Sequence, residues 1–342
     1  MTIGIRDIGP GDDAFASWHA AIREAHLADR ESAWWSSVES VRAYFGRPSD
    51  RTRHLAVAAF DRGICVGGAE DKLPLRWDVE TMSVELGVSP AAQGRGVGAR
   101  LASYVKELAV QHDRRIVQTE LYLRPGLALS HTPGGRFAEK HGFRTVNTED
   151  RLVLDLPADE GHLARLQQTF PRDDYVIRSW VDRCPDDLVA EWSRMRTHMD
   201  EDVPTGELTR TPQPVDVDRI REAERNFAEQ GWTRLRTAAL TADGRGAGYT
   251  EIYLSRHDTE FLVQDDTFVD RYHRGHRLGL RMKLANLRQL HDLPDHLRAG
   301  LRFLQTHTER HNTAMQRANG AFGFRRVDVL HELETDLTNL PA

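Results

Sequence analysis

Two kinds of hydrophobic pattern alternate along the chain, and they recur in the same order in its two halves. Short runs in which apolar and polar residues alternate, at 3–6 and at 176–178, predict strands with one buried face. Each run precedes a segment whose apolar residues lie three and four positions apart, at 12–28 and at 186–198. Because that spacing gathers the apolar residues on one side of a helix, each half is predicted to begin with a strand and a helix.

Three further strand-like stretches follow in each half and lead to a glycine-rich segment. They lie at 54–60, 64–69 and 81–88 in the first half, and at 235–240, 247–254 and 260–268 in the second. Pro90 follows the last stretch of the first half and is expected to end it, because proline has no backbone N–H to donate to a neighbouring strand.

The remainder of each half predicts helix, strand, helix and strand. The strands are expected near 116–123 and 152–156 in the first half, and near 301–306 and 327–333 in the second. Each half is therefore predicted to be a mixed α/β (α+β) domain. The predicted domains are 1–157 and 172–342, joined by a linker at 158–171 that carries a short helical pattern.

The two halves also share a residue-by-residue correspondence. Val88, Gly98 and Phe143 match Val269, Gly279 and Phe324, each 181 positions later, and we call this constant separation the repeat offset. The correspondence is expected to hold without a gap over about 55 positions, which indicates two copies of one structural unit.

Composition narrows the class of protein. Of the 342 residues, 39% are hydrophobic, enough for two cores, and the net charge of −6 argues against a nucleic-acid partner. No apolar run is long enough for a transmembrane helix, and Cys65 and Cys184 do not suggest a disulfide framework. We expect a cytoplasmic protein without a membrane partner, as a monomer or homodimer.

The glycine-rich segments are predicted to lie where a strand runs into a helix. Backbone N–H groups and the helix dipole make such a junction an anion site suited to a pyrophosphate, although a glycine-tuned helix start without a ligand is the alternative. The order of elements does not fit a Walker loop or a Rossmann site. The candidate binding residues are Gly87, Val88, Gln93, Gly94, Arg95, Gly96, Val97 and Gly98, and in the second half Val269, Arg274, Gly275, His276, Arg277, Leu278 and Gly279.

These segments, each followed by a Gly-Phe pair, resemble the acetyl-CoA-binding core of the GCN5-related N-acetyltransferases (GNAT). The second half looks like the C-terminal unit of tandem acetyltransferases common in actinobacteria, of which mycothiol synthase is a distant relative. The resemblance implies two domains, each a mostly antiparallel mixed sheet flanked by helices, with acetyl-CoA as co-substrate. It also implies that Asn312 contacts the cofactor arm, and that a small-molecule amine attacks the thioester directly.

Both halves depart from the family pattern. Arg277 replaces the first motif glycine in the second half, and His131 stands where Asn312 would be in the first. The tyrosine that often serves as the acid is replaced by Phe137 and Ala318. Because a thiol pKa of about 8.5 makes thiolate a tolerable leaving group, the missing acid does not exclude catalysis. The first half is expected to hold the better acetyl-CoA site, since Gly96 leaves the main chain open where Arg277 does not. Two alternatives favour the second half, because Arg277 could pair with a phosphate and Asn312 is retained there.

Four residues are candidates for proton transfer: Glu85, Glu120 and Tyr122 in the first half and Asp266, next to Asp265, in the second. Each has a plain structural alternative as a solvated or ion-paired side chain, and a water relay is equally possible. Trp34, Trp35, Tyr44 and Phe45 either line an acceptor pocket or pack in a core. His307 and His311 are interpreted as exposed histidines at a helix start, and no metal site is predicted.

The resulting hypothesis is an N-acetyltransferase that acts on a primary amine of a small molecule. One alternative is a catalytic half paired with a degenerate scaffold half. The other is a non-catalytic protein that binds or senses acyl-CoA, which the missing tyrosines make plausible.

Overall fold

A computed structural model describes residues 3–339, which form two compact units. The first unit comprises Met1–Glu149, Thr205–Thr211 and Val327–Ala342, and the second comprises Asp150–Pro204 and Pro212–Arg326. Within the described residues, no helix is both long and apolar enough to cross a membrane.

The first unit contains a mixed sheet with the strand order β1-β2-β3-β4-β5-β12. Its strands are β1 (Ile3–Ile8), β2 (Thr52–Asp61), β3 (Ile64–Pro74), β4 (Thr81–Val88), β5 (Ile116–Leu123) and β12 (Arg325–Asp336). Every neighbouring pair is antiparallel except β4 and β5, which run parallel. The predicted fold class, a mostly antiparallel mixed sheet flanked by helices, is confirmed.

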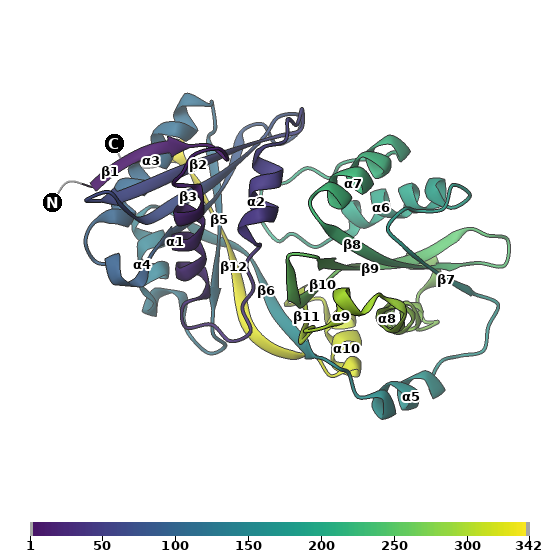
Figure 1. Cartoon of the computed structure of the whole chain (residues 1–342). Helices are drawn as coiled ribbons and strands as arrows, with labels where there is room; N and C mark the ends of the chain where they lie inside the picture. The colour runs from purple at the N-terminus through teal and green to yellow at the C-terminus, as the bar shows by residue number, and fades with distance from the viewer. Residues whose placement is uncertain (1–2, 340–342) are drawn as a thin grey trace. The chain divides into compact units, whose positions relative to one another are not determined.

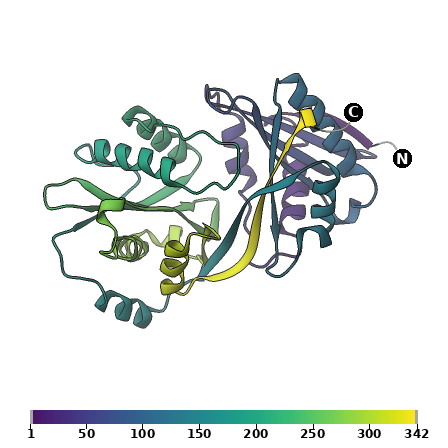
Figure 2. The same cartoon turned by 180° about the vertical axis from the view of Figure 1, so that it is seen from behind.

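Helices cover both faces of this sheet because its strands alternate apolar side chains to either side. Ala56 and Ala58 of β2 pack with α1 (Phe15–Leu27) and α2 (Val38–Phe45), while Val57 and Ala59 pack with α3 (Val97–Gln111). A shorter helix, α4 (Pro133–Lys140), lies on the α3 side. Figure 1 shows α1 on one side of the strands, and Figure 2 gives the view from behind.

The parallel pair at the centre of the first unit separates partway along its length. Thr81–Val84 of β4 pairs with Ile116–Thr119 of β5, and the pairing ends there. Beyond Val84, β4 continues to pair with β3 as far as Val88. The two strands therefore diverge toward the glycine segment, and we call this divergence the splay.

The second unit repeats the arrangement, with the strand order β6-β11-β10-β9-β8-β7. Its strands are β6 (Arg144–Asp155, which begins in the first unit), β7 (Val176–Val181), β8 (Trp232–Leu240), β9 (Gly246–Ser255), β10 (Asp258–Val269) and β11 (Phe303–Glu309). Its helices are α5 (Glu160–Gln168), α6 (Val189–Asp202), α7 (Val217–Glu229), α8 (Leu278–Arg288), α9 (Asp295–Arg298) and α10 (Thr313–Phe322). Again one pair, β10 and β11, is parallel.

The predicted repeat is confirmed at its landmarks. Gly98 and Gly279 are each the second residue of a helix, α3 and α8. Across the preceding hairpins, Ala69 pairs with Leu86 and Thr250 pairs with Thr267, so the repeat offset persists on both strands.

The expectation of an ungapped register is wrong in the middle of the repeat. Thr81 pairs with Ile116, whereas Leu262, the counterpart of Thr81, pairs with Leu304, which lies seven positions beyond the counterpart of Ile116. The second unit inserts α9 and a short 3-10 helix, η4 (Gln289–Asp292), before β11, and its connection from β11 to α10 is correspondingly shorter. The insertion and the shortening compensate each other in length. Residues at the two ends of the repeat therefore keep the repeat offset, and the offset alone shows neither change.

One feature of the second half differs from the predictions. His307 lies on β11 and His311 follows the end of that strand, so the expected helix start at these histidines is wrong; α10 begins at Thr313. The segment 158–171 contains α5, in agreement with its short helical pattern. The N-cap of α5 is Asp159, whose carboxylate accepts a hydrogen bond from the His162 backbone N–H.

The compact units also differ from the predicted sequence segments, because the last strand of the chain belongs to the first unit. Val329–Asp336 of β12 pairs antiparallel with Ile116–Leu123 of β5, as the yellow strand beside β5 in Figure 1 shows. The first unit thus obtains its sixth strand from the far end of the sequence. Hydrophobic periodicity predicts that a strand exists but does not indicate which strand it pairs with. The domain boundaries predicted from the sequence therefore could not assign β12 to the first unit.

Candidate functional site

The glycine segment of the first unit forms the N-terminus of α3. Gly94 and Gly96 have φ angles of +72° and +83°, a left-handed conformation that side chains disfavour, and Gly96 is the N-cap residue. No side chain caps this end of α3. The helix therefore presents its first backbone N–H groups together with the positive end of its dipole, as an anion site requires.

The other residues of the segment have local partners. The Gln93 side-chain amide donates to the Val88 carbonyl at 3.0 Å, and the Arg95 guanidinium donates to Asp61 at 2.5 Å. Gly98 lies against Phe137, and a Cβ there would make an ordinary 3.4 Å contact with the ring. Gly87 is tighter still, because a Cβ would approach the Ile22 Cα of α1 to 3.0 Å. Val97, the first residue of α3, is buried.

In the matching segment of the second unit, the side chains bind partners within that unit, and no side chain caps α8. Arg277 is the N-cap residue of α8 and adopts the left-handed conformation at φ +53°, and its guanidinium donates to the Thr169 hydroxyl at 2.5 Å. Arg274 donates to the Val269 carbonyl at 3.2 Å, and His276 lies 3.3 Å from Asp173. Gly275, like Gly94, has a positive φ, and Leu278 is buried.

Asn312, the residue expected at the cofactor arm, is the N-cap residue of α10. Its side-chain oxygen accepts a hydrogen bond from the Met315 backbone N–H at 3.1 Å. Thr132 performs the same function for α4 in the first unit, beside His131. The structure thus gives Asn312 a capping role, and its contact with a cofactor stays a prediction.

Four glutamates form a row across the first unit, on the face that carries α1 and α2. Glu70 of β3 lies opposite Glu85 of β4, and Glu120 of β5 lies opposite Glu332 of β12. They line a cavity of about 280 Å³, which we call the acidic cavity. Other residues of its lining include Lys72, Ser83, Gln118 and Leu208.

Glu85 is held by a chain of polar contacts from α1. The His26 Nδ1 lies 3.3 Å from the Glu85 carboxylate, while Arg30 donates to the His26 Nε2 at 2.6 Å. Because Nε2 accepts, the ring proton is assigned to Nδ1, which then donates to Glu85. Arg30 is held in turn by the buried carboxylate of Asp328 at 2.9 Å. Removal of water by the surrounding protein raises the Glu85 pKa to about 7, although Arg30 acts in the opposite direction.

Glu120 and Tyr122 lie on the neighbouring strand and contact each other. The Tyr122 hydroxyl donates to the Glu120 carboxylate at 3.2 Å, and the Arg30 guanidinium stacks 4.0 Å from the centre of the Tyr122 ring. The surrounding protein, and then Glu85, raise the Glu120 pKa to about 7 even though its side chain remains accessible from the cavity. Burial raises the Tyr122 pKa well above its usual value, so the phenol stays protonated and orients Glu120.

Glu70 completes the row with an aromatic partner. The Tyr44 hydroxyl donates to its carboxylate, and burial raises the Glu70 pKa to about 7. Of the aromatic residues expected at an acceptor pocket, Trp35 packs on the His26 ring at 4.4 Å. Phe45 instead belongs to the core, with its ring 5.6 Å from that of Trp18.

A second cavity lies on the opposite face of the sheet, beneath α3 and α4. It measures about 160 Å³, and we call it the apolar cavity because its lining includes Leu86, Ala102, Phe137 and Ala138. Val84, Thr119 and Glu120 line both this cavity and the acidic cavity. The two cavities therefore meet at the splay, where the backbones of β4 and β5 part.

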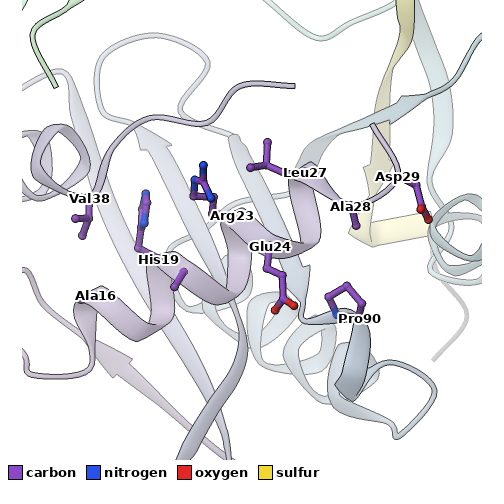
Figure 3. A pocket seen from close by; sticks show the side chains of 10 residues that line it. Ala16, His19, Arg23, Glu24, Leu27, Ala28, Asp29, Val38 and Pro90 are labelled. Carbon is purple, nitrogen blue, oxygen red and sulfur yellow. The ribbon is translucent and has the colours of Figure 1, made fainter. Parts of the chain in front are cut away.

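A larger and more open hollow of about 680 Å³ runs along the outer side of α1. Figure 3 shows His19, Arg23 and Glu24 standing on the helix, with Glu24 pointing toward the side where Pro90 lies. None of the four glutamates is part of its lining, so we place the candidate site at the two smaller cavities.

In the second unit, the counterparts of Glu70 and Glu85 are Glu251 and Asp266, and both are paired with arginine. Asp266 accepts from Arg196 at 2.8 Å and from the Tyr249 hydroxyl at 3.0 Å, and Glu251 also accepts from Arg196, at 2.7 Å. Asp265 accepts from the Tyr253 hydroxyl at 2.5 Å, and burial raises its pKa to about 7.

The positions that line the apolar cavity in the first unit carry polar side chains in the second. Lys283 follows Gly279 by four residues, as Ala102 follows Gly98, and it donates to Asn319 at 3.0 Å. Asn319, the counterpart of Ala138, donates in turn to Thr308 at 2.9 Å. Burial lowers the Lys283 pKa to about 7. The second unit therefore has a buried hydrogen-bonded chain at positions that line the apolar cavity in the first.

Sequence reasoning identified Glu85, Glu120 and Tyr122 but missed their partners Glu70, His26 and Arg30, and also Asp328 and Glu332. Glu70 could have been found, because the alternation of apolar and polar residues continues beyond 69, where the predicted strand ended. The sequence pattern gives no indication that Asp328 and Glu332 belong to the site, because only the pairing of β12 with β5 places them beside it. Within residues 3–339, no group of three or more His, Cys, Asp or Glu residues could hold a metal ion.

No protein-family model matches the sequence, and a search of curated proteins found no match. Solved structures are similar in fold. A tandem GNAT protein from the clavulanic acid biosynthesis pathway, solved without acetyl-CoA, aligns with a TM-score of 0.81 and 24% identity over 100% of both chains. A GCN5-related N-acetyltransferase from Sphaerobacter thermophilus aligns with a TM-score of 0.64 and 18% identity, over 98% of this chain and 96% of the other. Together with the repeated units described above, these likenesses show that the chain has the tandem GNAT fold.

Proposed function

We propose that the first unit transfers an acyl group, acetyl in the first instance, from its coenzyme A thioester to a primary amine of a small molecule. The observation that carries this proposal is the meeting of the apolar and acidic cavities at the splay, next to an anion site at the start of α3. The likeness to GNAT structures supports the same reaction class. A cytoplasmic location, an actinobacterial type and a distant relation to mycothiol synthase belong to the same proposal.

The donor would enter from the side of α3. Its pyrophosphate would bind the backbone N–H groups of Gly94–Gly98, and its thioester would reach the splay, where β4 beyond Val84 has no pairing to β5. The Gly96 conformation holds these amides in place, which is the pre-organisation that an anion site needs.

The acceptor would enter the acidic cavity and lose a proton before it reacts. Glu85 accepts that proton as its pKa of about 7 allows, and the neutral amine attacks the thioester carbon. The carbon–sulfur bond then breaks and the thiolate leaves, while the nitrogen that attacked releases its extra proton to water to give the neutral amide. Since Phe137 and Ala318 occupy the positions of the usual acid, the thiolate leaves unassisted or takes a proton from water. His26, Arg30 and Asp328 act as positioning residues for Glu85.

The second unit serves as a scaffold in this proposal. Arg196 pairs with Asp266 and Glu251, and the hydrogen-bonded Lys283 and Asn319 replace Ala102 and Ala138, which line the apolar cavity of the first unit. A non-catalytic protein that binds acyl-CoA is the competing hypothesis, since the same anion site would serve it.

A matched pair of variants tests whether the proposed anion site binds acetyl-CoA and which unit holds that site. Gly94 and Gly275 are separated by the repeat offset, both have positive φ, and a Cβ at either would meet no atom within 4 Å. Gly94→Asp places a negative charge beside the proposed pyrophosphate and should abolish acetyl-CoA binding in calorimetry and thiol release with an amine panel. Gly275→Asp imposes the same strain in the second unit and should leave both signals intact.

Other outcomes would overturn parts of the proposal. Loss of both signals only in Gly275→Asp would move the site to the second unit. Acetyl-CoA binding to the wild-type protein without thiol release for any amine would favour the sensing hypothesis.

A further inference from the structure

We propose that the acceptor carries at least two cationic groups, and that Glu70 binds an amino or guanidino group other than the amine that is acylated. This inference rests on the proposed function and specifies its substrate class. The second unit supplies the key observation, because there the protein itself provides a cation at the equivalent place.

In the second unit, two guanidinium groups meet one buried carboxylate. Glu251, which is 1% exposed, accepts from Arg196 at 2.7 Å and from Arg236 at 2.9 Å. These charges, Arg236 first, lower the Glu251 pKa to about 2 against the effect of burial. The Glu251 carboxylate is therefore a built cation site, already filled.

Glu70 occupies the same place in the first unit. It precedes Glu251 by the repeat offset, which the pairs Ala69–Leu86 and Thr250–Thr267 preserve on either side of the same hairpin. Glu70 and Glu251 thus follow structurally equivalent residues on the third strand of each unit.

The two positions that supply cations in the second unit are apolar in the first. Across the neighbouring strand, Glu251 lies opposite Arg236, whereas Glu70 lies opposite Ala56. On the covering helix, Arg196 lies one turn after Trp192, whose ring packs on Tyr249 at 4.7 Å.

The matching tryptophan of the first unit is Trp18. A Cβ at Gly68, the counterpart of Tyr249, would touch its ring, and the residue one turn later is the buried Ile22. The first unit therefore keeps the carboxylate but replaces both arginines, and it retains a cavity of about 280 Å³ beside it.

Charges from the rest of the unit do not replace the missing arginines. The His54 Nδ1 lies 4.0 Å from the Glu70 carboxylate, but burial lowers the His54 pKa to about 4, so the ring is neutral at pH 7. Arg30 is held by Asp328 and His26. Lys72 lines the acidic cavity, but it faces four glutamates there. A cation from the substrate would restore at Glu70 the pairing that the second unit builds with its own side chains.

The row of strands also sets the spacing of the two groups. The amine that reacts must lie at the splay, between Glu85 and Glu120, while the second group lies at Glu70 on the next strand. Neighbouring strands are separated by about 4.8 Å, so the two nitrogens would be about 5–7 Å apart. Butane-1,4-diamine in an extended conformation meets this requirement.

The test compares butane-1,4-diamine with butan-1-amine, which has the same chain length and one charge. Binding is measured by calorimetry without acyl-CoA, and kcat/KM is measured by thiol release with acetyl-CoA. The wild-type protein should prefer the diamine by about tenfold or more, the contribution of one charge-assisted hydrogen bond. Glu70→Gln should remove most of that preference, while Glu39→Gln, at an exposed glutamate of α2, should retain it.

A second variant introduces the missing cation as a side chain of the first unit. Ile22→Arg imitates Arg196 and should abolish the preference for the diamine, whereas Ile22→Met, which keeps the residue apolar, should not. Equal binding of the two amines by the wild-type protein, or a preference that survives Glu70→Gln, would overturn the inference. Selective binding of the diamine without thiol release would refute the proposed function but retain the cation site at Glu70. Equal turnover of both amines would support the proposed function and overturn this inference.

Discussion

Glu85 combines, at one strand position, the proposed general base with the contacts that determine its pKa. Its neighbours Val84 and Leu86 face the apolar side of the sheet, so the alternation of β4 turns Glu85 toward α1 and His26. The environment there disfavours charge and brings the pKa of this carboxyl to about 7, close to the value that suits a base at neutral pH.

The rate of transfer is therefore expected to rise with pH through about 7. Below that pH the raised pKa keeps Glu85 protonated and unable to accept a proton, and above it the carboxylate is free to do so. Glu85→Gln should lower kcat by about 10²–10⁴-fold and flatten this limb of the profile. The measurement is kcat against pH for both proteins; an unchanged limb in the variant would assign the base to another group, with Glu120 next in line.

At the scale of single elements, the two glycine segments build the same helix start from different residues. Gly96 and Arg277 both cap their helices in the left-handed conformation, although only glycine adopts it without strain. The second unit tolerates an arginine there, and its guanidinium is held by Thr169. The feature that both units share is thus the backbone turn, while the residue that adopts it differs.

Gly96→Ala should lower the free energy of unfolding by about 1–2 kcal/mol, the cost of a left-handed alanine, even though a Cβ there meets no neighbour within 4 Å. Gly98→Ala is the control. It lies inside α3 with an ordinary 3.4 Å contact to Phe137, so its stability should change little. Urea unfolding of both variants checks the prediction, and equal losses would show that steric contact, not backbone conformation, determines the stability of this turn.

At the scale of the whole chain, the last strand contributes to a site that begins near residue 26. Strand β12 places Asp328 against Arg30 and Glu332 in the acidic cavity. Asp328 is fully buried and Arg30 is 7% exposed, so this ion pair has little access to water. The proposed site is complete only when β12 has joined the sheet of the first unit.

Asp328→Asn should lower the stability of the protein by about 3–5 kcal/mol, because it leaves the Arg30 charge buried without its partner. It should also lower kcat, since Arg30 positions His26. Asp336→Asn on the same strand removes an accessible ion pair with Arg115 and should cost about 0–1 kcal/mol. Unfolding by urea and thiol release measure the two effects; similar small losses in both variants would show that β12 does not support the site.

Much of this protein could be predicted from its sequence because the information is local. Period-two alternation predicted the strands, three-to-four spacing predicted the helices, and recurrent glycines located the two helix starts that the structure confirms at Gly98 and Gly279. Alternation also predicted which way Glu85 faces. These properties depend on a residue and its near neighbours, which a linear pattern records.

Only the tertiary structure decided which strands are neighbours, and with that the composition of the site. The row from Glu70 to Glu332 is assembled by pairing between strands. One of these strands, β12, comes from the far end of the sequence and pairs with β5. The insertion before β11 and its compensation were likewise hidden, because the two ends of the repeat kept their offset. Strand partners are selected by the packing of whole faces against each other, and that choice leaves no periodic mark on either strand alone.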